Sequence, residues 1–128
     1  MLNLNHDDAP ALLRERFVVE IGIRQAWPYV TFADHRDEAS PQEVRLYIDS
    51  SFTVMPGPAV PVPAEEDDEK LRLLRLAEVL NRTVHDVTVE DDGSLMVRFH
   101  DNVRLRVSGH SQPWTAHDVW WLGSCPAG

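Results

Sequence analysis

Two stretches of strict alternation between apolar and polar residues constrain the fold of this chain more than any other feature of its sequence. Successive side chains of a β-strand point to opposite faces, so this pattern predicts strands with one buried face. Each stretch is interrupted by three residues with turn chemistry, 49–51 and 100–102, and each is therefore predicted to be a β-hairpin. The apolar positions are Val44, Leu46, Ile48, Phe52 and Val54 in the first stretch, and Leu95, Val97, Phe99, Val103 and Leu105 in the second.

The two stretches align position by position at a constant offset of 51 residues. We interpret this as two related β units separated by a helix, the alternative being a coincidence of two alternating patterns. Additional β-rich runs at 17–23, 29–32, 84–89 and 118–122 are predicted to be strands. The predicted class is α+β and mainly β, with two related antiparallel hairpin units that form a roll, sandwich or open barrel, and one helix at 65–80.

Side-chain parity fixes the register of the second hairpin. A three-residue loop at 100–102 sets Phe99 opposite Val103 on the apolar face, whereas a two-residue loop would set Phe99 opposite a charged residue. The same register sets Arg98 opposite Arg104, and like charges directly opposite each other are destabilising. Arg106 lies two residues further along the same face. Three arginines on one face call for counter-anions.

The predicted helix is amphipathic and acidic at its start. Leu73, Leu76, Ala77 and Leu80 fall on one face, and Asn81 is the predicted stop. The acids of 65–68 lie at the positive end of the helix dipole, which gives them a local structural role. These acids are Glu65, Glu66, Asp67 and Asp68.

The length of 128 residues fits a single domain covering 1–128. Within it we expect a loose polar leader at 1–13. The segment 56–63 has four prolines in eight residues and is predicted to be a stiff extended spacer. Residues 123–128 are expected to form a frayed tail.

The charge balance disfavours two classes of partner. The net charge is −9, with 14 acids and five bases in residues 1–69 and seven of each in residues 70–128. An acidic chain repels the phosphates of nucleic acids and of anionic membranes, so neither is an expected partner. No apolar run is long enough to span a membrane, and the first ten residues contain no lysine or arginine, so no secretory signal is expected. We therefore expect a cytoplasmic protein.

No motif of enzyme or cofactor chemistry is found. The sequence contains no phosphate-binding glycine loop, no nucleophile elbow and no zinc-binding spacing, and it has one cysteine. We therefore expect no catalytic residue, no cofactor and no metal. His110, His117 and Asp118 are close in sequence, and a metal site there is the alternative to ordinary surface residues.

Arginine and tryptophan, which are enriched at the centres of protein interfaces, mark the expected binding residues. The strand at 119–122 is apolar on both faces, so one face needs cover from elsewhere in the chain or from a partner. The alternatives are internal ion pairing or solvation for the arginines, and intramolecular cover for the tryptophans. The predicted contact residues are Arg98, Arg104, Arg106, Trp120, Glu65, Glu66, Asp67 and Asp68.

Residues 76–123 also carry a resemblance. They contain an Asp-Gly turn at 92–93, then Leu95, Phe99 and Asp101 at alternating spacing, and a late tryptophan strand before Leu122-Gly123. This arrangement resembles a family of small, uncharacterised bacterial β-rich proteins, and similar small proteins occur as immunity proteins of polymorphic toxin systems. The resemblance implies a structural scaffold without catalytic residues.

Together these observations favour a non-enzymatic protein-binding module, with neutralisation of a toxin as its most specific form. The alternative is a small-molecule binder or an enzyme with a site between the two β units. Self-association into a weak homodimer through the Trp120 strand is a third hypothesis, and a monomer is its counterpart.

Overall fold

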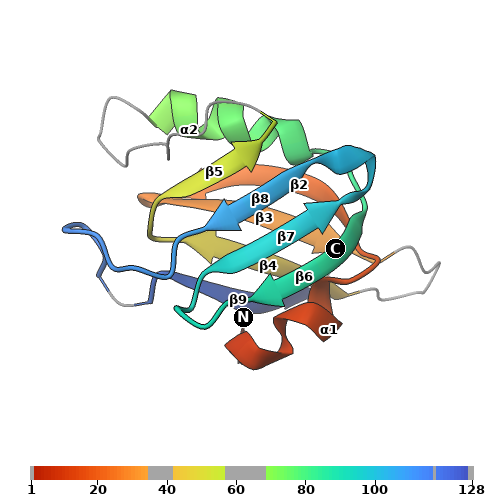
Figure 1. The fold of residues 1–128 in the computed structure, drawn as a ribbon, viewed down its shortest axis with the longest axis horizontal. Helices are drawn as coiled ribbons and strands as arrows, with labels where there is room; N and C mark the ends of the chain where they lie inside the picture. Colours follow the sequence, from red (N-terminus) through yellow and green to blue (C-terminus); the bar gives the residue numbers. More distant parts are fainter. Residues whose placement is uncertain (1, 35–41, 57–68, 117, 127–128) are drawn as a thin grey trace.

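The chain forms two antiparallel β-sheets in the computed structural model, which describes residues 2–34, 42–56, 69–116 and 118–126. Figure 1 shows the two sheets packed face to face, which confirms the mainly β, α+β class. The first sheet has the order β1 (Leu2–Leu4), β9 (Trp120–Pro126), β4 (Gln42–Ile48), β3 (Trp27–Ala33) and β2 (Phe17–Arg24). The second has the order β5 (Phe52–Met55), β8 (Arg104–Val107), β7 (Leu95–Phe99) and β6 (Val84–Val89).

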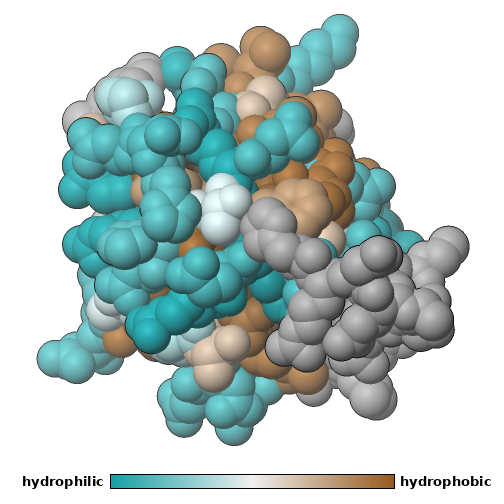
Figure 2. Space-filling view, turned by 90° about the vertical axis from the view of Figure 1, so that its right-hand side faces the viewer, coloured by the Kyte–Doolittle hydropathy of each residue, from teal (hydrophilic) through white to brown (hydrophobic). Residues whose placement is uncertain are grey.

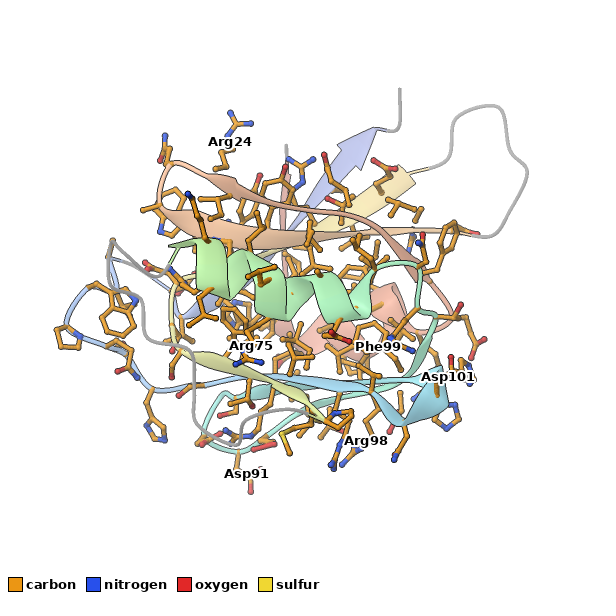
Figure 3. All side chains as sticks on the ribbon, turned by 90° about the horizontal axis from the view of Figure 1, so that it is seen from above. Arg24, Arg75, Asp91, Arg98, Phe99 and Asp101 are labelled. Atoms are coloured by element: carbon orange, nitrogen blue, oxygen red, sulfur yellow. The ribbon has the colours of Figure 1, made fainter. Side chains whose placement is uncertain are left out.

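The hydrophobic core fills the space between the sheets. Alternation along each strand sends every second side chain inward, so the apolar positions of β4 and β7 are buried while their polar neighbours face outward. Figure 3 shows this for one pair, with Phe99 between the sheets and Arg98 pointing away from them. The largest fully buried side chains include Trp120, Phe32, Phe52, Leu46, Ile48, Leu95, Leu105 and Leu122.

The predicted helix is present in the part of 65–80 that the structure describes. Helix α2 covers Glu69–Leu76 and continues as a 3-10 turn, η3, over Ala77–Val79. The helical turns end at Val79, and Asn81, the predicted stop, follows two residues later with a left-handed φ of 65°. Leu76 and Val79 are fully buried. Seen from above, α2 lies over the edge between the two sheets (Figure 3).

The expectation of a loose leader at 1–13 is wrong. Strand β1 pairs with β9, a 3-10 turn follows at His6–Asp8 (η1), and helix α1 covers Ala9–Leu13. Ala9 and Leu13 are fully buried, because α1 packs against β6. Proline in the first turn of α1 favours the start of a helix. Helix α1 thus adds a second α-helix, at the edge of the sandwich opposite α2 (Figure 1).

The first predicted hairpin is also wrong. Strand β4 pairs with β3 and β9 in the first sheet, whereas β5 pairs with β8 in the second. Residues 49–51 therefore carry the chain from one sheet to the other instead of turning it back on itself. The alternating pattern is the same in both cases, because strands on either side of a core bury the same parity of side chains. Without that hairpin, the two stretches are not structural repeats.

The connection at 49–51 is held by the long segment before β9. Asp49 is 4% exposed and Ser50 is fully buried, so their polar groups need partners inside the protein. The Ala116 N–H donates to Asp49 Oδ2 at 2.9 Å, and the Asp49 N–H donates to the Val119 carbonyl at 2.8 Å. The Ser50 hydroxyl donates to the His110 carbonyl at 2.9 Å. These bonds fix the position where the chain changes sheet.

The second hairpin has the predicted register. The Phe99 N–H donates to the Val103 carbonyl at 2.8 Å, and Arg98 lies opposite Arg104. The loop residues form a short 3-10 turn, η4, over His100–Asn102. Asp101 and Asn102 have φ of 69° and 66°, a left-handed conformation that Asp and Asn tolerate better than most residues.

Two further expectations concern the spacer and the tail. Residues 123–126 belong to β9 and pair with β4, so they are not a frayed tail. Strand β4 would have an unpaired edge without them. Of the predicted spacer 56–63, residues 57–63 lie outside the described residues, as do the final two residues of the chain.

The tight turn between β6 and β7, in the second sheet, is hydrogen-bonded to the first sheet. The indole N–H of Trp120, in the first sheet, donates to the Gly93 carbonyl of this turn at 2.8 Å. Ser94 is fully buried, and its hydroxyl oxygen accepts the Gly109 N–H at 2.9 Å. His6 stacks on Trp120 with ring centroids 4.0 Å apart, so the N-terminal segment also contacts this point.

We predict that Trp120→Phe lowers the free energy of unfolding by about 1–3 kcal/mol, because the half-buried Gly93 carbonyl loses its donor. Urea denaturation of both proteins measures the difference. Trp114→Phe is the control, since Trp114 is 39% exposed and its replacement should change stability by no more than about 0.5 kcal/mol. Equal losses in the two variants would contradict the role given to the indole N–H.

A second prediction concerns close packing at Gly109. A Cβ there would overlap the backbone of Asp92, Gly93 and Ser94, so we expect Gly109→Ala to cost about 1–3 kcal/mol of stability. At Gly22 an added Cβ would meet the end of the Tyr29 side chain, which can rotate away. Thermal unfolding should therefore show a smaller loss for Gly22→Ala, and the reverse order would contradict this packing.

Candidate functional site

The three predicted contact arginines lie on the outer face of the second sheet but have different surroundings. Arg106 is neutralised within the protein. Its guanidinium donates to Glu90 Oε1 at 2.8 Å and to the Ser94 hydroxyl at 3.2 Å, and it lies 4.0 Å from Asp92. The hydrogen bond with Glu90 is the main reason that the pKa of Arg106 is raised. Internal pairing, the alternative drawn from the sequence, therefore describes Arg106.

Arg98 and Arg104 lie side by side without such neutralisation. They are opposite each other on β7 and β8, and both are exposed. Within the described ranges, neither forms an ion pair. The two acids at this end of the sheet bind other arginines: Asp86 pairs with Arg14 at 2.9 Å, and Asp101 pairs with Arg82 at 3.5 Å.

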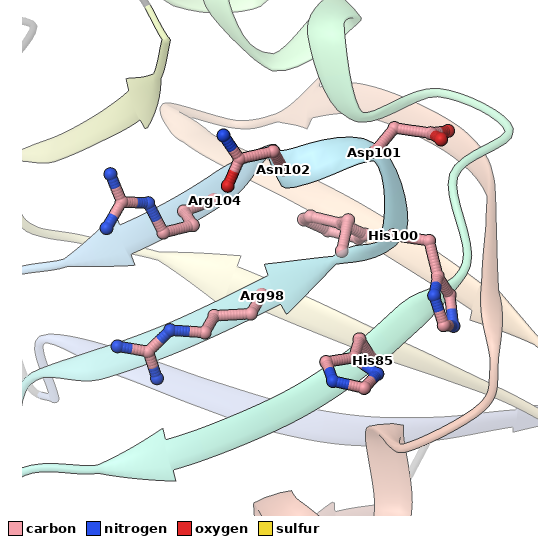
Figure 4. Close-up of a pocket in the computed structure, with 7 residues that line it drawn as sticks. His85, Arg98, His100, Asp101, Asn102 and Arg104 are labelled. Carbon is pink, nitrogen blue, oxygen red and sulfur yellow. The ribbon is translucent and has the colours of Figure 1, made fainter.

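The two arginines line a surface hollow with a volume of about 350 Å³. Figure 4 shows their guanidinium groups on one side of it and two imidazoles on the other. The carboxylate of Asp101 points away from both arginines in this view. The lining residues are His85, Arg98, Phe99, His100, Asp101, Asn102 and Arg104.

The two histidines were not among the residues predicted from the sequence. The rings of His85 and His100 are 5.0 Å apart between centroids and tilted by 58°. His85 sits at an irregularity of β6, between Val84 and Asp86, where the pairing with β7 shifts. His100 starts the η4 turn, and its N–H donates to the Thr83 carbonyl at 3.0 Å. Pairing the predicted strands 84–89 and 95–99 around the Asp-Gly turn would have brought these histidines together.

We call Arg98, Arg104, His85 and His100 the basic surface. Its four side chains come from three strands and one turn within 20 residues of sequence, and the buried Phe99 lines the hollow with them. Guanidinium groups present paired N–H donors that match carboxylate and phosphate oxygens. The basic surface is therefore suited chemically to an oxyanion.

Trp120 is a core residue and not a contact residue, because its side chain has no exposed surface. Strand β9 also lies between β1 and β4, and residues Leu122–Ser124 pair on both sides. For the homodimer hypothesis, the Trp120 side chain is therefore buried and the strand edge at Leu122–Ser124 is already paired with β1.

The other apolar face of this strand is covered within the chain. Trp121 stacks on Tyr47 at 5.3 Å between ring centroids and meets Trp27 edge-on at 5.2 Å. The Arg45 guanidinium lies 4.4 Å from the ring centre of Tyr29 and donates to Glu20 at 3.0 Å. Burial, followed by the charge of Glu20, raises the pKa of Tyr29. Contacts within the chain thus cover these aromatic residues in part, and Trp27, Tyr29 and Trp121 keep intermediate exposure.

The remaining predicted contacts cannot be placed. Glu65, Glu66, Asp67 and Asp68 lie outside the described residues. His117 also lies outside the described residues. His110 lies 3.3 Å from Asp92, and Asp118 is exposed.

A second hollow, beside α2, is apolar. It has a volume of about 460 Å³ and is lined by Ile21, Lys70, Leu73, Leu74 and Ala77. Leu74 is 68% exposed, which is high for a leucine. Figure 2 shows a largely hydrophilic face of the molecule, with hydrophobic side chains gathered on one part of it.

Searches for a metal site and for a membrane-spanning helix give negative results over the described ranges. No group of three or more His, Cys, Asp or Glu side chains there could hold a metal ion. None of the helices in the same ranges has the length and apolar character needed to cross a bilayer.

The turn between β6 and β7 predicts a pH dependence. The Asp92 carboxylate accepts the Ser94 N–H at 2.9 Å, and this bond, with the Ser94 hydroxyl and then His110 and Arg106, lowers the pKa of Asp92. A lowered pKa stabilises the fold above the unfolded-state value, and the contribution is lost as the pH falls through the folded-state value. We expect Asp92→Asn to lower the midpoint of thermal unfolding at about pH 7 and to lower it progressively less toward about pH 2, as Asp92 itself takes up a proton. A difference that persists unchanged at the lower pH would contradict this.

Comparisons of the chain with protein-family models, with curated proteins and with solved structures found no match.

Proposed function

We propose that this chain is a non-enzymatic protein-binding module that contacts carboxylates of a partner protein through its basic surface. One observation carries the proposal. Arg98 and Arg104 are held opposite each other and exposed, and neither forms an ion pair with an acid of the described residues, whereas Arg106 on the same face pairs with Glu90.

The arrangement of the two arginines has an energetic cost that binding would relieve. Like charges opposite each other on a sheet destabilise it by roughly 0.2–1 kcal/mol. Asp86 lies opposite Arg98 on β6 but also pairs with Arg14, and Asp101 pairs with Arg82, so these two acids offset the repulsion only in part. A carboxylate from a partner would accept hydrogen bonds from both guanidinium groups at once.

The rest of the chain would restrict where such a partner binds. With a net charge of −9, most of the surface repels an acidic segment, and the basic surface attracts it. Complementary charge of this kind steers association and suppresses wrong orientations more than it adds affinity.

Neutralisation of a toxin is the most specific form of the proposal. Its support is the resemblance of residues 76–123 to small bacterial β-rich proteins, among which immunity proteins occur. In this form the basic surface would cover acidic residues that the toxin needs.

A second candidate is the binding of a small anion, and the hollow of about 350 Å³ favours it. The site for a small molecule would then be at the outer face of the second sheet. It would not lie between two β units, because the space between the sheets holds the hydrophobic core.

The test is affinity capture of the tagged protein from a lysate of its source cells, compared with the variant Arg98→Glu/Arg104→Glu. We expect one stoichiometric partner with the original protein and at least about tenfold weaker binding of the purified partner to the variant, since both charges are reversed. Added salt should weaken the original complex more than the variant complex.

A matched control carries the same change in net charge elsewhere. Arg24→Glu/Lys70→Glu reverses two exposed charges, and Arg24 lies on the opposite side of the molecule from Arg98 (Figure 3). This control should retain the partner. Equal affinity of the partner for Arg98→Glu/Arg104→Glu and for the original protein would refute the proposal.

A further inference from the structure

The histidines of the basic surface add a property that the arginines alone do not have. His85 and His100 are exposed, they line the same hollow as Arg98 and Arg104, and their ring centroids are 5.0 Å apart. Histidine is the side chain that ordinarily gains its charge between about pH 8 and pH 5. Protonation would therefore bring two more positive charges to a hollow that already holds two.

We infer that the hollow formed by His85, Arg98, His100 and Arg104 is a proton-coupled binding site for adjacent carboxylates of an acidic protein segment. The inference rests on the proposed function and states how pH would regulate binding at the basic surface. Two protonated imidazoles at this separation repel each other and the neighbouring guanidinium groups. Carboxylates in the hollow offset that repulsion, so binding favours proton uptake and proton uptake favours binding.

The charges around the two imidazoles support this coupling. On β7 and β8 the facing groups are the two arginines. Of the acids nearby, Asp101 lies 3.5 Å from Arg82, and Asp86 lies 2.9 Å from Arg14 and opposite Arg98 in the β6–β7 register. From the segment between α1 and β2, Glu15 is exposed, and its N–H binds the Val84 carbonyl next to His85. Counted together, these groups are Arg14, Glu15, Arg82, Asp86, Arg98, Asp101 and Arg104.

The size of the hollow suits two carboxylate side chains, and its polar lining favours them over apolar groups. Its volume is about 350 Å³, and Asn102 adds an amide to the four basic side chains. Phe99 is 3% exposed and provides an apolar floor. A single small anion would leave part of the lining without a partner, so an acidic segment is the better match.

The probe for the test is a hexaglutamate peptide, whose carboxylates stay ionised between about pH 5.5 and pH 8. Its dissociation constant is measured by calorimetry at both pH values and low ionic strength. We expect binding to be on the order of tenfold tighter at about pH 5.5, because each proton taken up on binding adds a slope of minus one to the plot of log affinity against pH.

Two variants test whether His85 and His100 cause the pH dependence of peptide binding. His85→Gln/His100→Gln should keep the affinity measured at about pH 8 and lose the increase at about pH 5.5. His110→Gln removes an exposed histidine that lies outside the hollow, beside Asp92, and should keep the increase. The same unfolding midpoint in all three proteins would show that the fold is unaffected.

The outcomes separate this inference from the proposed function. Peptide binding that Arg98→Gln/Arg104→Gln abolishes, but that is equal at both pH values, would overturn the proton coupling and leave the basic surface as a contact. Absence of peptide binding at both pH values would overturn both. Inorganic sulfate that binds as tightly as the peptide would overturn the acidic segment as the occupant.

Discussion

The fold depends on how the chain passes from one sheet to the other at Asp49–Ser51. A backbone that leaves a sheet abandons its hydrogen-bonding partners while still surrounded by the core, and its polar groups must be satisfied there. The segment before β9 satisfies them with bonds to the Asp49 carboxylate, the Asp49 N–H and the Ser50 hydroxyl. Because the same segment positions Gly109 and Trp120 against the turn between β6 and β7, one set of hydrogen bonds sets the spacing of both sheets.

Sequence patterns identified the strands much better than their partners. Alternation predicts which side chains of β4, β5, β7 and β8 are buried, and parity predicts the pairing of Arg98 with Arg104. It does not distinguish a hairpin from a connection between sheets, since both bury the same side chains. The leader was misjudged for a related reason: Ala9 and Leu13 are buried by contacts with β6, more than 70 residues away, and no local pattern records such a contact.

The candidate site was predicted only in part. Side-chain parity alone predicts that Arg98 lies opposite Arg104. That Arg106, unlike this pair, has acidic partners was seen only from the positions of Glu90 and Asp92 in the structure. The position of His85 depends on an irregularity in β6, which periodicity does not encode. Alternation places the adjacent Trp120 and Trp121 on opposite faces, but which of them faces the core needed the register of β9 with β4.

The place of β9 in the first sheet bears on how the protein is made. Strand β9 contributes residues 120–126 and lies between β1 and β4. Until those residues leave the ribosome, β1 has no neighbour in its sheet and β4 has a bare edge. The second sheet, from β5 to β8, needs no residue beyond 107. Synthesis in the amino-to-carboxyl direction therefore allows the hairpin with the basic surface to form before the sheet behind it is complete.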